Sequence, residues 1–586
     1  MSCLTEFLKT KKRMIFWITF AAILQVFGTL LVPFFVAEII DTGIAQKDET
    51  AILWLGLKML GAAGLTAVVS LWGSYLCADL SALTGQYLRE RLFDKTQLLS
   101  IKDFSHFGTA SMITRATADI SIIQQTQIMF TQMILPTPLI SVAAIIMTAA
   151  VNPALVPIPL ISMAVFLFTS FLLFKKASPI SKTIQRHIDT INRIVRESIV
   201  GMRVIRAFDN TDYERRRSDG AFSEYAENVI RLNRIFAAFN PVVWTVMGIA
   251  MAAVVWFGGY QVLNGVIEVG SITAVSEYTI LMLVYLMMAA MVLVMMPKMV
   301  VSMERIQEVL DAVPEIEDGV LSGDSGQKER DEIQEKVVFK NVTFSYKGAE
   351  APVLEDLSFT CEKGKTTAII GGTGSGKSTA AGLILRLYDI QKGQILLEGE
   401  DIRTMTQHEL RERVSYVPQK AFLFSGTIAD NLRMGKKDAS MEELRRGAEI
   451  AQAHSFISSL DEDYGTHVSQ GGNNFSGGQK QRLCIARALV KKAPVYIFDD
   501  SFSALDFKTD AALRFQLKQE IKDSAVIIIA QRISTIMDAD QIIVLDGGKT
   551  AGIGTHRELM ETCTIYKEIA DSQLTEKEAD QYGKLR

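Results

Sequence analysis

Long apolar runs are concentrated in the first half of the chain. Six of them reach the roughly 20 residues that an α-helix needs to cross a bilayer. They lie at 14–37, 52–78, 129–151, 154–174, 235–262 and 272–301. The pattern predicts a transmembrane domain over residues 1–310, made of six spans, with both ends of the chain on one side of the lipid bilayer. The first run is too long for a secretory signal and is followed by further runs.

The connections between the predicted spans alternate between short and long. The two long ones, 79–128 and 175–234, hold many Lys and Arg residues, and a basic cluster at 9–13 precedes the first span. Basic residues favour the cytoplasmic side of a membrane. The sequence therefore predicts a multi-pass protein of the plasma membrane with cytoplasmic N- and C-termini.

The long connections have helical rather than loop-like periodicity. Around Ile194 and Val195, for example, apolar and charged residues alternate at helical spacing. An arm of about 25 residues would extend roughly 35–40 Å beyond the membrane at 1.5 Å per residue. The turning points at about 105–115 and 201–213 are predicted to be coupling segments that contact another domain, with a plain solvated turn as the alternative.

The second half of the chain alternates short β-rich runs with helical segments, which is the pattern of an α/β domain. This domain is predicted over 337–571. The polar segment 311–336 contains several glycines and charges and is predicted to be a linker. The charged residues 572–586 are predicted to form a C-terminal tail.

Composition agrees with this division. Hydrophobic residues make up 49% of the chain although it also carries 61 basic and 65 acidic residues, so apolar and charged residues are segregated along it. A net charge of −4 gives no sign of nucleic-acid binding. The five cysteines are scattered and form no metal-ligand spacing or disulfide framework.

A phosphate-binding loop follows the predicted strand 366–370. The sequence from Gly371 to Ser378 matches G-x-x-x-x-G-K-[ST] and precedes a predicted helix. Glycines let the backbone fold around a phosphate, so that N–H groups and the helix N-terminus face the anion. Lys377 adds a charge at the outer phosphates, and the Ser378 hydroxyl is predicted to bind magnesium. The predicted nucleotide-binding residues here are Gly371, Gly372, Thr373, Gly374, Ser375, Gly376, Lys377, Ser378 and Thr379.

A second element of phosphate chemistry is the apolar strand predicted at 495–498, which ends in Asp499 and Asp500. An acid delivered by a strand beside a phosphate-binding loop is the Walker B arrangement. Asp499 is predicted to hold magnesium, directly or through water.

A third element is the sequence Ser476, Gly477, Gly478 and Gln479, followed by a predicted helix at 480–490. It resembles the signature of ATP-binding cassette (ABC) proteins, usually Leu-Ser-Gly-Gly-Gln, with Phe475 in place of the leucine. With six spans and two long arms, the similarity covers almost the whole chain. It implies one half of an ABC exporter of the type I fold: a six-helix transmembrane domain with long cytosolic extensions, then an α/β P-loop ATPase domain.

The resemblance also implies roles for three further residues and two ligands. Tyr346 matches the aromatic residue that stacks on adenine, Gln419 matches the glutamine that reaches the magnesium, and Asp506 lies in the D-loop. The implied ligands are ATP and Mg²⁺.

The chain departs from the family at two catalytic positions. The family has a glutamate, the general base or water-orienting group, where this chain has Asp500, and a histidine that contacts the γ-phosphate where it has Gln531. The side chain of Asp500 is one methylene shorter than glutamate, which withdraws its carboxylate by about 1 Å or more. Gln531 cannot carry the charge or the proton of an imidazole. Gln470 and Gly471 also replace a Glu-Arg pair, and the sequence offers no physical account of that change.

Taken together, the resemblance implies that this chain's own site binds ATP and hydrolyses it poorly, while 476–479 complete the site of a partner. The expected partner is a second half-transporter with the usual glutamate and histidine, in a bacterial heterodimer that exports hydrophobic or amphipathic drug-like compounds. A homodimeric exporter of lipid or peptide, an importer, and a membrane ATP sensor that transports nothing are the alternatives.

Two features of the sixth span bear on the substrate. Met288, Met291, Met295 and Met299 recur at helical spacing, and flexible thioethers suit a surface that repacks around different apolar ligands. Packing against lipid or core is the alternative. Glu277 is costly inside a membrane and is either functional or placed in water near the outer interface.

Overall fold

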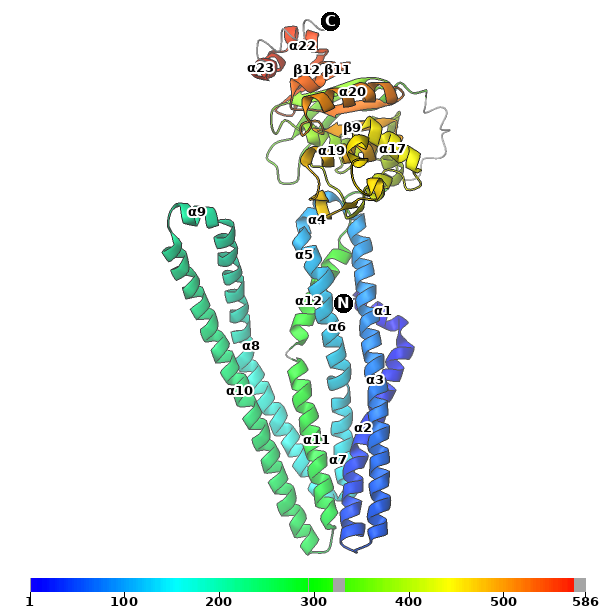
Figure 1. Ribbon diagram of the computed structural model, residues 1–586. Coiled ribbons are helices and arrows are strands. Elements are labelled where there is room, and N and C mark those ends of the chain that lie inside the picture. The colour runs from blue at the N-terminus through cyan, green and yellow to red at the C-terminus, as the bar shows by residue number, and fades with distance from the viewer. Residues whose placement is uncertain (1, 294, 320–331, 574–586) are drawn as a thin grey trace. The chain divides into compact units, whose positions relative to one another are not determined.

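The computed structural model describes residues 2–293, 295–319 and 332–573 (Figure 1). The chain divides into two compact units, Met1–Leu98 with Phe107–Ala312, and Leu99–His106 with Val313–Arg586. Residues 320–331 of the predicted linker and 574–586 of the predicted tail lie outside the described residues.

The first unit is built from helices. Among the described residues, six helical stretches are long and apolar enough to cross a membrane. These stretches are Lys12–Ile44, Glu49–Leu98, Thr109–Val151, Pro153–Val200, Thr211–Leu263 and Val269–Asp311. The six spans predicted from the apolar runs are therefore confirmed. Helices suit this role because every backbone N–H and C=O inside a bilayer must find a partner within the protein.

The helical elements of the first 311 residues often continue one another with little interruption. They are α1 (Ser2–Thr10), α2 (Lys12–Glu38), η1 (Ile39–Ile44), α3 (Glu49–Leu98), α4 (Ile101–Phe107), α5 (Thr109–Thr114), η2 (Arg115–Asp119), α6 (Ile120–Met129), η3 (Phe130–Ile134), α7 (Pro136–Val151), η4 (Pro153–Leu155), α8 (Pro157–Val200), α9 (Met202–Ala207), α10 (Thr211–Leu263), α11 (Val269–Leu293) and α12 (Met296–Asp311).

Several of these helices are much longer than a membrane is thick. Helix α10 has 53 residues and α3 has 50, so each extends for about 75–80 Å. Helices α8 and α10 lie side by side and are joined by the short α9 (Figure 1). The chain turns at residues in left-handed conformation, with φ of +76° at Gly108 and +51° at Asp209. The long connections are thus helical arms with short breaks at their tips.

The segment around α4 groups with the second unit, although it lies inside the range 1–310 predicted for the transmembrane domain. Lys102 forms an ion pair with Glu315. The backbone N–H of Glu315 donates to Oδ2 of Asp103 at 3.1 Å. Both contacts lie within the second unit, where they join the segment around α4 to Glu315.

The predicted sixth span is not one uninterrupted helix. Helix α11 ends at Leu293, and α12 begins at Met296 with Pro297 in its first turn. Proline has no N–H, and its ring clashes with the carbonyl four residues earlier, so a helix cannot continue unchanged through it. Met288 therefore lies on α11 and Met299 on α12, and the methionine face stays a prediction.

The described residues of the second unit form three sheets. Their strands are β1 (Glu335–Phe344), β2 (Leu354–Glu362), β3 (Thr366–Gly371), β4 (Lys392–Leu397), β5 (Glu400–Asp401), β6 (Val414–Val417), β7 (Gly426–Thr427), β8 (His467–Val468), β9 (Val495–Asp499), β10 (Ala525–Ile529), β11 (Gln541–Asp546) and β12 (Lys549–Gly554). One sheet has the order β2-β1-β4-β5, one has β12-β11-β3-β10-β9-β6, and β7 pairs with β8. In the six-stranded sheet all neighbours are parallel except β11 and β12.

Helices surround these sheets. They are α14 (Lys377–Ile384), α15 (Gln407–Arg413), α16 (Ile428–Arg433), α17 (Met441–Ile450), α18 (His454–Ile457), η5 (Asp463–Gly465), η6 (Gln470–Gly472), α19 (Gly477–Val490), α20 (Phe507–Glu520), α21 (Ile533–Ile536), α22 (His556–Thr562) and α23 (Thr564–Gln573). Strands β9 and β10 are buried along their whole length, which is typical of parallel strands covered on both faces. Two apolar clusters form the core of this unit.

A buried ion pair ties the first strand of this unit to the turn after β4. Nζ of Lys336 lies 2.7 Å from Oε1 of Glu398, and their side chains are only 2% and 4% exposed. Removing the ammonium leaves the carboxylate buried, with Arg413 at the longer distance of 3.8 Å. We expect Lys336→Met to lower the free energy of unfolding of this unit by about 3–5 kcal/mol, measured by denaturant unfolding of the full chain.

The matched control is the surface pair Lys549 and Glu355, whose side chains are 64% and 47% exposed. Lys549→Met should cost about 0–1 kcal/mol, since water screens such a pair. Replacing both buried partners, as in Lys336→Met with Glu398→Leu, should recover most of the loss. Equal effects of the two single lysine changes would contradict this account.

Candidate nucleotide-binding site

Three adjacent parallel strands end at the same edge of the six-stranded sheet. Strand β10 pairs with β3 on one side and β9 on the other, and Ile529 lies opposite both Ile369 and Asp499. The carboxyl ends of parallel strands meet at one edge, where ligands of such sheets commonly bind. The register therefore brings the phosphate loop after β3, the acids at the end of β9 and the segment after β10 to one place.

The loop between β3 and α14 has the shape of an anion cradle. Gly374 and Gly376 have φ of +83° and +95°, which only glycine adopts without cost. A Cβ added at Gly372 or Gly374 would meet no other protein atom within 4 Å, so there is room for phosphates against the backbone. Helix α14 begins directly at Lys377 with no side chain capping its N–H groups. These observations fit a bound nucleotide phosphate.

Lys377 folds back over this loop. Its Nζ donates to the carbonyls of Gly371 at 2.9 Å and Gly372 at 2.6 Å. Burial lowers the pKa of Lys377, and the nearby charges of Asp500 and Asp499 oppose this effect. The ammonium is thus held at the mouth of the cradle, where an incoming phosphate would meet it.

The predicted magnesium ligands come together from two elements. Ser378 Oγ donates to Oδ1 of Asp499 at 3.1 Å, and the hydroxyl of Tyr416 donates to Oδ2 at 3.3 Å. Burial raises the pKa of Asp499, while these two hydrogen bonds lower it. Hydroxyl and carboxylate oxygens are the ligands that Mg²⁺ prefers beside nucleotide phosphates. Ser378, Asp499 and Gln419 would hold that ion.

Asp500 accepts hydrogen bonds from two amide side chains on one oxygen. Nε2 of Gln531 lies 2.8 Å from Oδ2 of Asp500, and Nε2 of Gln419 lies 3.4 Å from the same atom. Asp500 has φ of +46°, an uncommon conformation for a residue with a Cβ. Burial raises its pKa, and the hydrogen bond from Gln419 and the charge of Arg532 act in the opposite direction. The two positions that depart from the family therefore touch each other.

Tyr346 lies next to the start of α14. Its hydroxyl shares a hydrogen bond with Oγ1 of Thr379 at 3.1 Å. Its ring makes an edge contact with Tyr388, with centroids 5.3 Å apart, and remains 39% exposed. An aromatic ring held beside the phosphate loop with free surface suits the predicted stacking on a base.

The signature segment forms the start of helix α19. The helix begins at Gly477, earlier than the predicted residue 480, because Ser476 and Gln479 form a reciprocal capping box. Helix α19 packs against α16, α17 and β6, whereas α14 packs against β3 and β9. The signature thus belongs to a different part of the unit from the phosphate loop.

Two neighbouring positions have local structural roles. Asp506 caps helix α20 by accepting the N–H of Thr509 at 3.0 Å, and this bond lowers the pKa of Asp506. Gly471 has φ of +69°, which gives a physical reason for glycine at that position. Nothing in the structure explains Gln470.

Comparison with known proteins decides the family. Residues 15–296 match the ABC transporter transmembrane region and residues 354–503 match the ABC transporter family. An ABC transporter ATP-binding protein of Mycobacterium tuberculosis is 35% identical over 98% of both chains. The chain belongs to the ABC transporter family. Its ATP-binding domain is an ATPase coupled to transport, as the resemblance implied.

Other relatives of this ABC transporter have more specific names. A putative multidrug export ATP-binding/permease protein of Bacillus subtilis is 32% identical over 96% of this chain and 97% of its own length. An ATP-dependent lipid A-core flippase of Haemophilus ducreyi is 29% identical over 92% of each. The structure of a bacterial Atm1-family ABC exporter with ATP bound is similar with a TM-score of 0.80 and 25% identity, over 96% of this chain and 99% of the other. The predicted exporter fold is therefore confirmed.

Some contacts of this ABC transporter's site were not predicted from the sequence. Tyr416 lies on β6, and its contact with Asp499 depends on β6 pairing with β9 in register. The bond from Gln531 to Asp500 depends in the same way on β10 pairing with β9. No local pattern in the sequence reveals which strands become neighbours.

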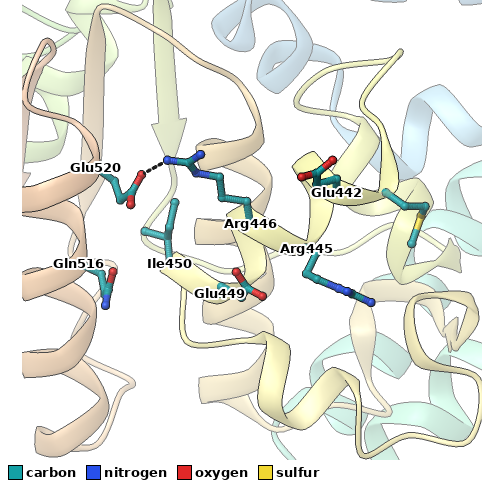
Figure 2. A pocket seen from close by; sticks show the side chains of 8 residues that line it. Glu442, Arg445, Arg446, Glu449, Ile450, Gln516 and Glu520 are labelled. Atoms are coloured by element: carbon teal, nitrogen blue, oxygen red, sulfur yellow. Dashed lines mark hydrogen bonds and ion pairs between the residues drawn. The ribbon is translucent and has the colours of Figure 1, made fainter.

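A cleft of about 870 Å³ lies between α17 and α20 and contains none of the predicted nucleotide-binding residues (Figure 2). Arg446 Nη2 lies 2.6 Å from Oε2 of Glu520 across it, and Arg445, Glu442 and Glu449 also line it. Both signs of charge are present and the walls are exposed. The cleft therefore indicates no particular ligand.

Replacing Asp500 by Asn should raise the melting temperature of the nucleotide-free protein at pH 7. Burial raises the pKa of Asp500 above its ordinary 3.8, so keeping its charge is unfavourable, and asparagine removes that charge. The gain should be complete above the raised pKa and should disappear as the pH falls toward 3.8, where the folded and unfolded forms are both protonated. Thermal unfolding monitored at pH 4 to 8 measures it.

Asp506→Asn is the control, because asparagine also caps helices and the pKa of Asp506 is lowered rather than raised. This variant should gain no stability at pH 7. A gain for Asp500→Asn that is as large at pH 4 as at pH 7 would rule out the charge explanation.

Proposed function

We propose that the chain is one half of a heterodimeric bacterial exporter of hydrophobic or amphipathic compounds, and that its own ATP site mainly retains ATP. The observation that carries the proposal is the hydrogen bond from Gln531 to Asp500 at 2.8 Å. It joins the two departures from the family into one arrangement. A catalytic carboxylate needs its oxygens free to orient water, and here two amides engage one of them.

Geometry adds to this effect. The aspartate side chain is one methylene shorter than the glutamate of the family, and a misplacement of about 1 Å can cost about 10²-fold in rate. Gln531 donates a hydrogen bond but cannot become charged as a histidine can. The site keeps its phosphate loop and its magnesium ligands, so slow hydrolysis with sustained binding is the expected behaviour.

The signature is available to a partner subunit. Helix α19 presents the N-terminal amides of Gly477 and Gly478, and a Cβ added at Gly477 would meet no protein atom within 4 Å. In ABC dimers the signature of one subunit faces the ATP of the other. Segment 476–479 therefore completes a hydrolytic site on a partner that carries the glutamate and the histidine.

The domain roles follow the same scheme. Residues 1–310 form the transmembrane domain, 311–336 the linker, 337–571 the ATP-binding domain and 572–586 the tail, with both termini in the cytoplasm. The segments 105–115 and 201–213 couple ATP-driven movement to the spans. At the second arm tip the short helix α9 is flanked on both sides by non-helical residues, Gly201 and Phe208, which suits this role.

The substrate class rests on the apolar spans and on the relatives. The Bacillus subtilis relative is named for multidrug export and the Haemophilus ducreyi relative for lipid A-core. A hydrophobic or amphipathic substrate is compatible with both names. A homodimeric lipid exporter is the second candidate, favoured by the flippase relative alone.

The first test measures hydrolysis. The purified chain alone should hydrolyse ATP far more slowly than the complex with its partner, and Asp500→Ala should change the activity of the complex by less than about twofold. Asp500→Glu should raise hydrolysis at this chain's site, by up to about 10²-fold, because it restores the reach of the carboxylate. Turnover by each site is followed by selective labelling with a photoreactive ATP analogue.

Native mass measurement separates the two candidates, since a heterodimer contains one copy of this chain and a homodimer contains two. Full activity of the chain alone, lost on Asp500→Ala, would refute the retained-ATP site.

The second test concerns the signature. Gly477→Asp places a carboxylate in the first turn of α19, which helices tolerate well, but directs it at the partner's ATP. We expect hydrolysis by the complex and efflux of a fluorescent hydrophobic cation from vesicles to fall about 10²-fold or more, as when a transition-state contact is lost. ATP retention at this chain's own site should persist.

Met441→Asp is the control, because Met441 is the equivalent first residue of α17, a helix capped in the same way by Ser440 and Glu443. This variant should transport normally. If Gly477→Asp also transports normally, the signature does not serve a partner's site.

A further inference from the structure

The side chain of Gln573, the last residue of α23, pairs with the backbone on both sides of Arg532. Its Nε2 donates to the carbonyl of Gln531 at 2.8 Å, and its Oε1 accepts the N–H of Ile533 at 2.8 Å. The side-chain amide of Gln573 thus pairs with the carbonyl of Gln531 and the N–H of Ile533, in the way that the backbone of a neighbouring strand would. The residue that it holds, Gln531, is the one that bonds to Asp500.

The segment from Gln531 to Ile533 depends on such support. Gln531 and Arg532 are exposed, and Arg532 is extended and gives no side-chain cap to the short helix α21. The N–H of Ile533 is the first donor of that helix, and Gln573 satisfies it. Further along, Nη1 of Arg514 donates to the carbonyls of Ser534 and Thr535, both at 3.2 Å. Side chains from α20 and α23 therefore fix the course of the chain after β10.

We infer that Gln573 is a positioning residue for this chain's ATP site: it aims Gln531 at Asp500, and thereby lets the C-terminal helix α23 set how long ATP is retained. The inference rests on the proposed function, because it concerns the site that retains ATP. Gln573 touches the backbone of Gln531 and acts through it. Gln531 is exposed, so packing does not fix its side chain. The hydrogen bond from Gln573 to its backbone is therefore the contact that orients it.

Helix α23 keeps its place without Gln573. Tyr566 and Ala570 on this helix are completely buried in the core of the unit. The hydroxyl of Tyr566 also shares a hydrogen bond with Nδ1 of His556 at 2.8 Å. Loss of the amide at position 573 should therefore release the segment after β10 while α23 stays docked.

The experiment uses the full-length chain in its native complex. Its site is loaded with radiolabelled ATP and Mg²⁺, and loss of label from this chain is followed by photo-crosslinking at successive times. Gln531→Ala and Gln573→Ala should each speed the loss about three- to tenfold, the range of an ordinary hydrogen bond. The double variant should lose label no faster than either single one, because both changes break the same link.

Ser572→Ala is the matched control. It lies beside Gln573 on the same exposed end of α23, and its hydroxyl donates to the carbonyl of Ile569 in its own helix, at 2.8 Å. Its rate of label loss should equal that of the unmodified complex.

Gln573→Glu separates positioning from packing. The glutamate keeps the shape and the acceptor for Ile533, but when ionised it cannot donate to the carbonyl of Gln531. It should release label about as fast as Gln573→Ala at pH 8. Retention should recover toward that of the unmodified complex as the pH falls through about 4.3 and the carboxyl gains its proton, whereas Gln573→Ala should show no such recovery.

Multiplying effects of Gln531→Ala and Gln573→Ala in the double variant would overturn the inference, and so would an unchanged rate for Gln573→Ala. Failure of the proposed function looks different. If the unmodified complex turns over ATP quickly at this chain's site, that proposal fails, yet the comparison of single and double variants still decides whether Gln573 acts through Gln531.

Discussion

The parallel pairing of β3, β10 and β9 is the constraint on which the rest of the ATP-binding unit depends. Ile529 lies opposite both Ile369 and Asp499, so β9 and β10 end level with one another and β3 continues two residues further, to Gly371. A one-residue slip of β10 would turn every side chain on it to the other face of the sheet. The fully apolar sequence of β10 and its burial on both faces hold it between its neighbours. This strand pairing brings together the phosphate loop, Asp499 and the segment after β10.

Within that frame, the two unusual residues make chemical sense together. The side chain of Asp500 is one methylene shorter than the glutamate of the family. This leaves room for the neutral amide of Gln531, whose Nε2 donates to Asp500 at 2.8 Å. A hydrogen bond to an ionised group is among the stronger ones in proteins. It offsets part of the burial that raises the pKa of Asp500. The arrangement is the basis of the proposal that this site retains ATP.

The membrane half follows a different rule. Its backbone N–H and C=O groups must form hydrogen bonds within the protein, so the chain is helical almost throughout. The helices break where a residue cannot continue a helix. Gly108 and Asp209 turn the arms in left-handed conformation, and Pro297 ends α11. These breaks divide the long helices into shorter straight segments.

The sequence by itself determined the six spans, the helical arms, the α/β domain and the nucleotide motifs. Each is a local pattern whose meaning is fixed by bilayer thickness, helical period or phosphate chemistry. It also showed that Asp500 and Gln531 depart from the family, as single positions. Only the tertiary structure decided that they touch, that Tyr416 bonds to Asp499, and that Gln573 holds the segment after β10. These contacts join residues 31, 83 and 42 positions apart, and strand order and helix docking, which no local pattern encodes, bring them together.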